Sequence, residues 1–227
     1  MANRINIAID GPASSGKGTV ARKVAESLDF SYIDSGSMYR AVALLALREG
    51  ISLEDEIGLA DLASTMDFEF SWSESKLQLR VGGEDVTEAL RKEAIGNGAS
   101  KVAVHPALRN SLLERQRNLA SQGAVVMDGR DIGSVVLPNA KLKIFLDASV
   151  GERARRRTAE LRSRGLIVEY DTIEAEIVAR DTQDKNRKTA PLIQADDAVY
   201  IDTTGVTAEQ AAEQIVGMAQ QIMTNMA

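Results

Sequence analysis

The chain has 227 residues, 44% of them hydrophobic, which suits one α/β domain with a buried core. It has no cysteine and a single histidine, His105, so disulfides, thiolate metal sites, cysteine nucleophiles and histidine clusters are excluded. The net charge is −6, yet six arginines lie between residues 153 and 164, which indicates a small anionic ligand rather than nucleic acid. No apolar run is long enough to span a membrane and no signal peptide is evident, so we expect a cytoplasmic protein.

The apolar pattern alternates between strand and helix along the chain. We expect strands at 4–10, 30–34, 124–128, 142–147 and 198–202. We expect helices at 17–28, 37–47, 92–104 and 106–121, through the arginine-rich segment, and from Thr172 and Thr207 onward. Strands separated by helices predict a central parallel sheet with helical layers on both faces.

One stretch departs from this alternation. Phe68, Phe70 and Trp72 alternate with polar residues, and so do the apolar residues at 77, 79 and 81, with the polar run 73–75 between them. Period-two alternation predicts an antiparallel hairpin, which Gly82 and Gly83 close. We therefore expect a single domain, residues 1–227, with two insertions: 37–105, which contains the hairpin, and a helical lid at 150–187.

The strongest local motif is the phosphate loop between the first strand and the first helix. It fits the pattern G-x-x-x-x-G-K, in which glycines let backbone N–H groups curl around phosphate oxygens and the lysine reaches the β- and γ-phosphates. The residues predicted to bind ATP are Gly11, Pro12, Ala13, Ser14, Ser15, Gly16, Lys17, Gly18 and Thr19. The hydroxyl residue that usually follows the lysine is replaced by Gly18. We therefore expect Thr19 to contact either phosphate or a metal-bound water.

The arginine-rich helix supplies the other candidate catalytic residues. Arg153, Arg156 and Arg157 stand at i, i+3 and i+4, on one helix face, and guanidinium groups hold phosphate oxygens bidentately. We predict that they act with Lys17, forming a lid that closes over the ATP phosphates and excludes water. A solvated helix face is the plainer interpretation of such a charge run, and it is the one we expect for Arg155 and Arg162.

Four segments in the same order resemble the cytidylate kinase family of P-loop nucleoside monophosphate kinases. They are Lys-Gly-Thr at 17–19, Asp-Ser-Gly-Ser-Met-Tyr-Arg at 34–40, Asp-Gly-Arg-Asp-Ile-Gly at 128–133, and Arg-Asp-Thr-Gln-Asp-Lys-Asn-Arg at 180–187. The resemblance covers the whole chain, hairpin included. It implies a P-loop NTPase fold and ATP-dependent phosphorylation of CMP or dCMP with Mg²⁺, in pyrimidine metabolism. Nothing in the sequence demands more than a monomer, so we expect a monomer that binds neither nucleic acid nor membranes. We expect the region 37–105 to hold the monophosphate.

The resemblance also assigns the residues that bind the acceptor. It places Ser35, Arg40, Arg130 and Arg187 around the monophosphate, Arg180 and Asp184 at the ribose, and Ser100, Arg109 and Asp131 at the base. A carboxylate such as Asp131 can accept a hydrogen bond from the N4 amino group of cytosine, whereas the uracil carbonyl would repel it. No direct metal ligand is assigned, and Asp128 either organises Mg²⁺ through water or caps the next turn.

Most of these residues have plainer interpretations. Arg40 and Arg109 could be surface charges, Ser35 a helix N-cap, Ser100 a surface hydroxyl, and Asp184 with Arg187 an exposed ion pair. His105, before a proline at a helix boundary, is expected to be structural or exposed. The competing functions are another acceptor (AMP, UMP, GMP or shikimate), a P-loop switch or transport ATPase, and an inactive binding protein. The hairpin and the Gly-Arg-Asp segment favour cytidylate kinase, and no Asn-Lys-x-Asp motif of GTPases is present.

Overall fold

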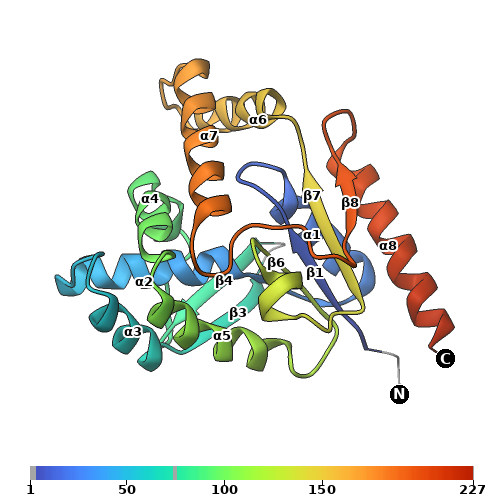
Figure 1. Cartoon of the computed structure of the whole chain (residues 1–227), viewed down its shortest axis with the longest axis horizontal. Coiled ribbons are helices and arrows are strands. Elements are labelled where there is room, and N and C mark those ends of the chain that lie inside the picture. Colours follow the sequence, from blue (N-terminus) through green and yellow to red (C-terminus); the bar gives the residue numbers. More distant parts are fainter. Residues whose placement is uncertain (1–3, 74–75, 227) are drawn as a thin grey trace. The chain divides into compact units, whose positions relative to one another are not determined.

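The computed structural model describes residues 4–73 and 76–226 (Figure 1). Within it the chain divides into two compact units. The first contains the residues up to Tyr32 together with those from Gln122 onward, and the second runs from Ile33 to Ser121. Among the helices of the described ranges, none is long and apolar enough to cross a bilayer.

A five-stranded sheet in the order β2-β6-β1-β7-β8 organises the first unit. β1 (Asn6–Asp10) pairs in parallel with β6 (Val125–Gly129) and β7 (Leu142–Asp147), and β7 pairs in parallel with β8 (Val199–Asp202). β2 (Ser31–Asp34), which begins in this unit, lies at the other edge. β1 and β6 are almost wholly buried, as expected for continuous apolar strands covered on both faces. The predicted parallel sheet is confirmed.

The helices of the first unit form two pairs (Figure 1). α1 (Lys17–Leu28) packs against α8 (Ala208–Asn225), and α6 (Val150–Ser163) packs against α7 (Tyr170–Asn186). The second pair shares a small apolar core made of Ala154, Leu161, Ile173 and Ile177. α7 begins two residues before the predicted start at Thr172, and α8 begins directly after its N-cap Thr207.

The second unit combines helices with a small antiparallel sheet. Its helices are α2 (Ser35–Glu49), α3 (Glu56–Thr65), α4 (Glu93–Val102) and α5 (Pro106–Ala120), with a 3-10 turn at Ala89–Arg91. Its strands are β3 (Phe68–Ser73), β4 (Lys76–Val81) and the short β5 (Glu84–Asp85), in the order β3-β4-β5. The hairpin is confirmed, because Phe68 pairs with Val81 and Phe70 with Leu79. Residues 74–75 and the side chains of 72–76, including Trp72, lie outside the described part.

Some local features differ from the expectation. α3 and β5 were not predicted, and neither was the π-helical turn η2 (Ile132–Val136). α2 begins at Ser35, and its N-cap is Asp34, whose carboxylate accepts a hydrogen bond from the Ser37 N–H at 3.1 Å. The alternative in which Ser35 is the N-cap is therefore wrong. His105 precedes α5, and its Nε2 lies 2.8 Å from the Leu53 carbonyl, which fits the structural role expected for it.

Asp10 joins the end of β1 to η2. Its two carboxylate oxygens accept hydrogen bonds from the N–H groups of Ile132 and Gly133, each at 2.7 Å. A Cβ at position 133 would lie 3.2 Å from Cδ of Lys143 and 3.4 Å from the Asp10 carboxylate, so glycine suits this tight approach. Burial raises the pKa of Asp10 to about 6, although both N–H groups favour the charged form. The carboxylate thus couples the strand before the phosphate loop to the segment after β6.

We expect Asp10→Asn to alter the pH dependence of stability. The pKa of Asp10 in the folded state, about 6, exceeds the reference value of 3.8, so the folded state binds more protons between these values. Protonated Asp10 therefore contributes to the free energy of unfolding below pH 4, and this contribution is lost as the pH rises through 6. The loss is roughly 3 kcal/mol, because the pKa is raised by about two units. Denaturant unfolding of both proteins from pH 4 to 7 measures this change.

Asparagine is neutral throughout this range and loses one of the two N–H hydrogen bonds at every pH. Its cost is therefore a constant offset, and only the change with pH reports on the charge of Asp10. The wild type should lose stability relative to Asp10→Asn as the pH rises. A difference that stays constant from pH 4 to 7 would contradict the raised pKa.

Candidate active site

The phosphate loop, residues 11–19, depends on glycine at two positions. A Cβ at Gly11 would lie 2.0 Å from the carbonyl oxygen of Leu146, so no side chain fits there. Gly16 has φ of 88°, in the left-handed region, and is the N-cap of α1. The loop therefore leads from β1 directly into a helix N-terminus, where unpaired N–H groups and the helix dipole favour an anion.

Lys17 and Ser15 place polar groups inside this loop. The Lys17 side chain is buried, and its Nζ donates a hydrogen bond to the Pro12 carbonyl at 3.0 Å. Burial, aided by the positive charge of Arg130, lowers the pKa of Lys17 to about 7, against the opposing charge of Asp128. Ser15 Oγ is also buried and makes no hydrogen bond to any described residue. Both groups are suited to an anionic ligand. Such a ligand would favour the charged form of Lys17 and would accept a hydrogen bond from the Ser15 hydroxyl.

Arg153 is buried, with an exposed fraction of 3%, and is engaged on several sides. It donates to the carbonyls of Ala148 at 2.9 Å and Ala13 at 3.0 Å, and it pairs with Asp181 of α7 at 2.6 Å. Asp147 lies 3.9 Å away. In this arrangement Arg153 ties α6 and α7 to the phosphate loop, and its predicted catalytic role stays a prediction.

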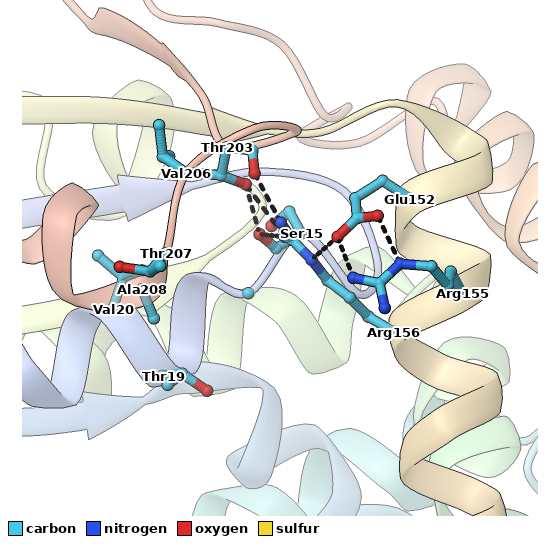
Figure 2. Close-up of a pocket in the computed structure, with 11 residues that line it drawn as sticks. Ser15, Thr19, Val20, Glu152, Arg155, Arg156, Thr203, Val206, Thr207 and Ala208 are labelled. Carbon is cyan, nitrogen blue, oxygen red and sulfur yellow. Dashed lines mark hydrogen bonds and ion pairs between the residues drawn. The ribbon is translucent and has the colours of Figure 1, made fainter.

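Arg156 contacts the loop from one turn further along α6, as Figure 2 shows. Its guanidinium donates to the Ser15 carbonyl at 3.3 Å, to Thr203 Oγ1 at 3.1 Å and to the Thr203 carbonyl at 2.6 Å. Its Nε donates to Glu152 at 2.8 Å. Hydrogen bonds from Arg155, and then from Arg156, lower the pKa of Glu152 to about 2, so this carboxylate is charged at neutral pH.

Arg157, the third predicted lid residue, has a more open environment. Its Nη1 pairs with Glu160 at 3.0 Å, one turn along the same helix, and 31% of its side chain is exposed. Arg155 is 68% exposed, and Arg162 is exposed as well, which agrees with the solvated face expected for both. The arginines predicted to share one face therefore differ in what they contact.

A cavity of about 360 Å³ opens beside the loop, within the first unit (Figure 2). It is lined by Ser15, Gly16, Thr19 and Val20 from the loop and α1, by Glu152, Arg155 and Arg156 from α6, and by Thr203, Val206, Thr207 and Ala208 after β8. The segment after β8 was missed by the sequence analysis. Its place could have indicated it, because ligands bind beyond the carboxyl ends of parallel strands.

Four of the five acceptor residues predicted in the first unit form two ion pairs. Nε of Arg130 lies 2.7 Å from the Asp184 carboxylate, and Nη2 of Arg187 lies 3.4 Å from that of Asp131. Burial alone would raise the pKa of Asp184, but the charges of Arg130 and Arg180 and the Arg130 hydrogen bond lower it on balance. These two ion pairs join residues 130–131 to the end of α7. Asp184 is mostly buried, unlike the exposed pair with Arg187 that was the plainer alternative.

Two of the acceptor residues predicted in the second unit lie at the start of α2. Ser35 is its first residue and is buried, and Arg40 pairs with Asp34 at 3.3 Å. The Arg40 side chain is 35% exposed.

The other two lie on α4 and α5. Ser100 Oγ donates to the Gly96 carbonyl at 3.5 Å. Arg109 is only 7% exposed, and its guanidinium lies over the Tyr39 ring at 5.3 Å from the centroid. Burial contradicts the alternative in which Arg109 is a surface charge. Binding of the acceptor by the four second-unit residues stays a prediction.

Asp128 is the carboxylate predicted to assist a metal near the loop. It lies in β6, is 5% exposed, and accepts a hydrogen bond from the Tyr32 hydroxyl at 2.6 Å. Thr19, the other candidate, lines the cavity, and its hydroxyl lies 3.5 Å from Arg22 Nη2. Residues 4–73 and 76–226 contain no cluster of three or more acidic, histidine or cysteine side chains that could hold a metal. A carboxylate such as Asp128 beside a phosphate loop fits Mg²⁺, which keeps several waters and binds chiefly to substrate phosphates.

Comparison with known proteins identifies the family. Residues 7–221 match the cytidylate kinase family. The chain is 44% identical to the cytidylate kinase of Pasteurella multocida (strain Pm70), over 97% of each protein, and 49% identical to that of Geobacillus thermodenitrificans (strain NG80-2), over 97% of this chain and 99% of the relative. An uncharacterized protein from Eubacterium ventriosum ATCC 27560 shares the fold, with a TM-score of 0.55 and 14% identity over 96% of this chain and 99% of the other. The phosphate loop, the parallel sheet and the extent of these matches show that the chain belongs to the cytidylate kinase family.

Proposed function

We propose that this protein transfers the γ-phosphoryl group of ATP to CMP or dCMP, giving ADP and CDP or dCDP, in pyrimidine nucleotide metabolism. The observation that carries the proposal is the buried Lys17 in a loop shaped by Gly11 and Gly16, in a chain that aligns with a cytidylate kinase over 97% of its length. Transfer between two polyanions needs positioning and cancelled repulsion, and little covalent chemistry from the protein. Lysine and arginine side chains supply that charge.

The donor binds to the loop and to the cavity beside it. The ATP phosphates lie against residues 11–19, where they favour the charged form of Lys17 that burial disfavours. The adenosine part enters the cavity, whose apolar lining includes Val20 and Val206. Arg156 and Glu152 form one wall and keep the loop and the segment after β8 together.

Of the three arginines predicted to act on phosphate, Arg157 is the most available to the triphosphate. Arg153 and Arg156 already donate to loop carbonyls, so they hold the loop in shape and reach phosphate only by exchanging those partners. Arg157 gives up only a partly exposed pair with Glu160, which costs little. We assign residues 150–187 as the lid that brings this charge over the phosphates and excludes water.

The acceptor contacts the segment after β6 and the end of α7. Arg130 and Arg187 bind the monophosphate, and Asp184 with Arg180 binds the ribose. Asp131 accepts a hydrogen bond from the N4 amino group of cytosine. Its ion pair with Arg187 orients the carboxylate. We also assign Ser35, Arg40, Ser100 and Arg109, in the region 37–105 and just beside it, to acceptor binding.

Asp128, through water, and Thr19 beside it would help to hold the Mg²⁺ that arrives with ATP. When bound, the ion neutralises charge on the β- and γ-phosphate oxygens. We infer that the enzyme works as a monomer on these small molecules in the cytoplasm, where nucleotides are made, without nucleic-acid or membrane partners. A monomer suffices because one chain supplies every residue assigned to the reaction.

The first test is a panel of acceptors. Purified protein is incubated with Mg²⁺-ATP and with each of CMP, dCMP, UMP, AMP and GMP, and ADP and the diphosphate products are measured. We expect fast turnover with CMP and dCMP and slow turnover with the others, because Asp131 accepts a hydrogen bond from the N4 amino group of cytosine, whereas uracil faces it with a carbonyl. Preference for another monophosphate would overturn the acceptor assignment, and ATP hydrolysis indifferent to every acceptor would overturn the kinase.

Arg157→Ala should reduce kcat by about 100-fold or more, because a charge that stabilises the transferred phosphoryl group is lost. Arg164→Ala is the matched control, since Arg164 pairs with the same Glu160 carboxylate from the exposed end of α6. Steady-state kinetics and thermal unfolding of both variants make the comparison. Equal kcat values in the two variants would contradict the assigned role of Arg157.

A further inference from the structure

The phosphate loop lacks a hydroxyl at the position where such loops usually carry one. In the common pattern a serine or threonine directly follows the lysine, and its oxygen binds Mg²⁺. Here Gly18 stands at that position. A loop that binds Mg²⁺-ATP without this oxygen must either do without it or obtain it from elsewhere.

Tyr32 brings an oxygen to the same place from another element. A Cβ at Gly18 would lie 3.3 Å from the Tyr32 hydroxyl and 3.9 Å from Oδ2 of Asp128. A side chain at position 18 would therefore point at these two oxygens. Tyr32 belongs to β2 and Asp128 to β6, which are neighbours in the sheet.

The two oxygens are joined by a short hydrogen bond. The Tyr32 hydroxyl donates to Oδ1 of Asp128 at 2.6 Å, and both residues are at most 5% exposed. A hydroxyl that donates a hydrogen bond to a carboxylate is polarised, and its lone pairs become better hydrogen-bond acceptors. Water molecules bound to Mg²⁺ are strong donors, so a carboxylate and a polarised hydroxyl suit them.

We propose that Tyr32 supplies from β2 the hydroxyl that the loop lacks, and that with Asp128 it accepts hydrogen bonds from the water molecules of nucleotide-bound Mg²⁺. The inference rests on the proposed use of Mg²⁺-ATP and adds a residue that the motif does not contain. Tyr32 is a positioning residue, because it acts on the water shell of the ion rather than on the reacting phosphoryl group. The same geometry explains why position 18 is glycine, since a larger residue would crowd the Tyr32 hydroxyl oxygen.

The test measures nucleotide binding without turnover. ADP affinity is determined by calorimetry in Mg²⁺ and in EDTA for the wild type, Tyr32→Phe and Tyr200→Phe. Tyr200 is a half-exposed tyrosine on β8, so Tyr200→Phe controls for the loss of a phenol hydroxyl elsewhere in the unit. Mg²⁺ should raise the ADP affinity of Tyr32→Phe by a factor roughly 10-fold smaller than in the wild type. The ADP affinity in EDTA should be unchanged. Tyr200→Phe should match the wild type in both conditions.

A second variant separates this role from packing. In Tyr32→Phe the oxygen near position 18 is gone, so adding Gly18→Ser places a hydroxyl in the same space from the loop side. The double variant should regain most of the Mg²⁺ effect, which a packing role of Tyr32 does not predict. An unchanged Mg²⁺ effect in Tyr32→Phe, an equal loss in Mg²⁺ and EDTA, or no recovery in the double variant would overturn the inference.

The acceptor panel keeps this result apart from the proposed function. If the wild type phosphorylates CMP but Tyr32→Phe keeps the full Mg²⁺ effect, only the role of Tyr32 is wrong. If the wild type phosphorylates no monophosphate, the kinase proposal fails whatever the variant shows. A wild type whose ADP affinity does not respond to Mg²⁺ also overturns the inference.

Discussion

The hydrogen bonds that Ile132 and Gly133 donate to the buried Asp10 carboxylate couple the two parts of the first unit to which we assign nucleotide binding. β1 runs into the phosphate loop one residue after Asp10, and β6 runs into Arg130 and Asp131. Adjacent strands alone would align their ends but leave the segments beyond them free to move. Two N–H donors on one carboxylate remove that freedom, and the raised pKa of Asp10 reflects the desolvation that accompanies it.

Charge balance imposes a second constraint, because the arginines assigned to phosphate binding must be stable without a phosphate. In the first unit these arginines are matched by carboxylates: Arg153 by Asp181, Arg156 by Glu152, Arg130 by Asp184 and Arg187 by Asp131. An unpaired buried guanidinium would cost several kcal/mol, roughly 3–5 for a broken buried pair. A phosphate that enters competes with carboxylates already in place, so binding exchanges partners rather than filling an unpaired positive site. A net charge of −6 is compatible with polyanionic ligands, because the electrostatic potential at a binding site depends on the charged groups near it and not on the net charge of the whole protein.

Features set by local chemistry could be predicted from the sequence, and features set by distant partners could not. Gly11 and Gly16 identified the phosphate loop, and the alternation of Phe68, Phe70 and Leu79 identified the hairpin. Helix periodicity put Arg153, Arg156 and Arg157 on one face, but it could not separate their environments. Those depend on Asp181 in α7 and on the Thr203 segment after β8, which only the fold brings to α6. The same reason explains why that segment was missed, and why Asp184 was first considered with Arg187 rather than with Arg130.

Gly18 shows how far a motif defined along the chain can differ from a site defined in space. The motif assigns the metal-directed oxygen to the residue after the lysine, and by that criterion this loop is incomplete. In space the oxygen is present, held by Asp128 and contributed by Tyr32, fourteen positions further along the chain than Gly18. The Mg²⁺ water shell responds to the position and polarity of an oxygen and not to the element that carries it. A missing hydroxyl in such a loop is therefore evidence of lost metal assistance only after the neighbouring strands have been searched for a replacement.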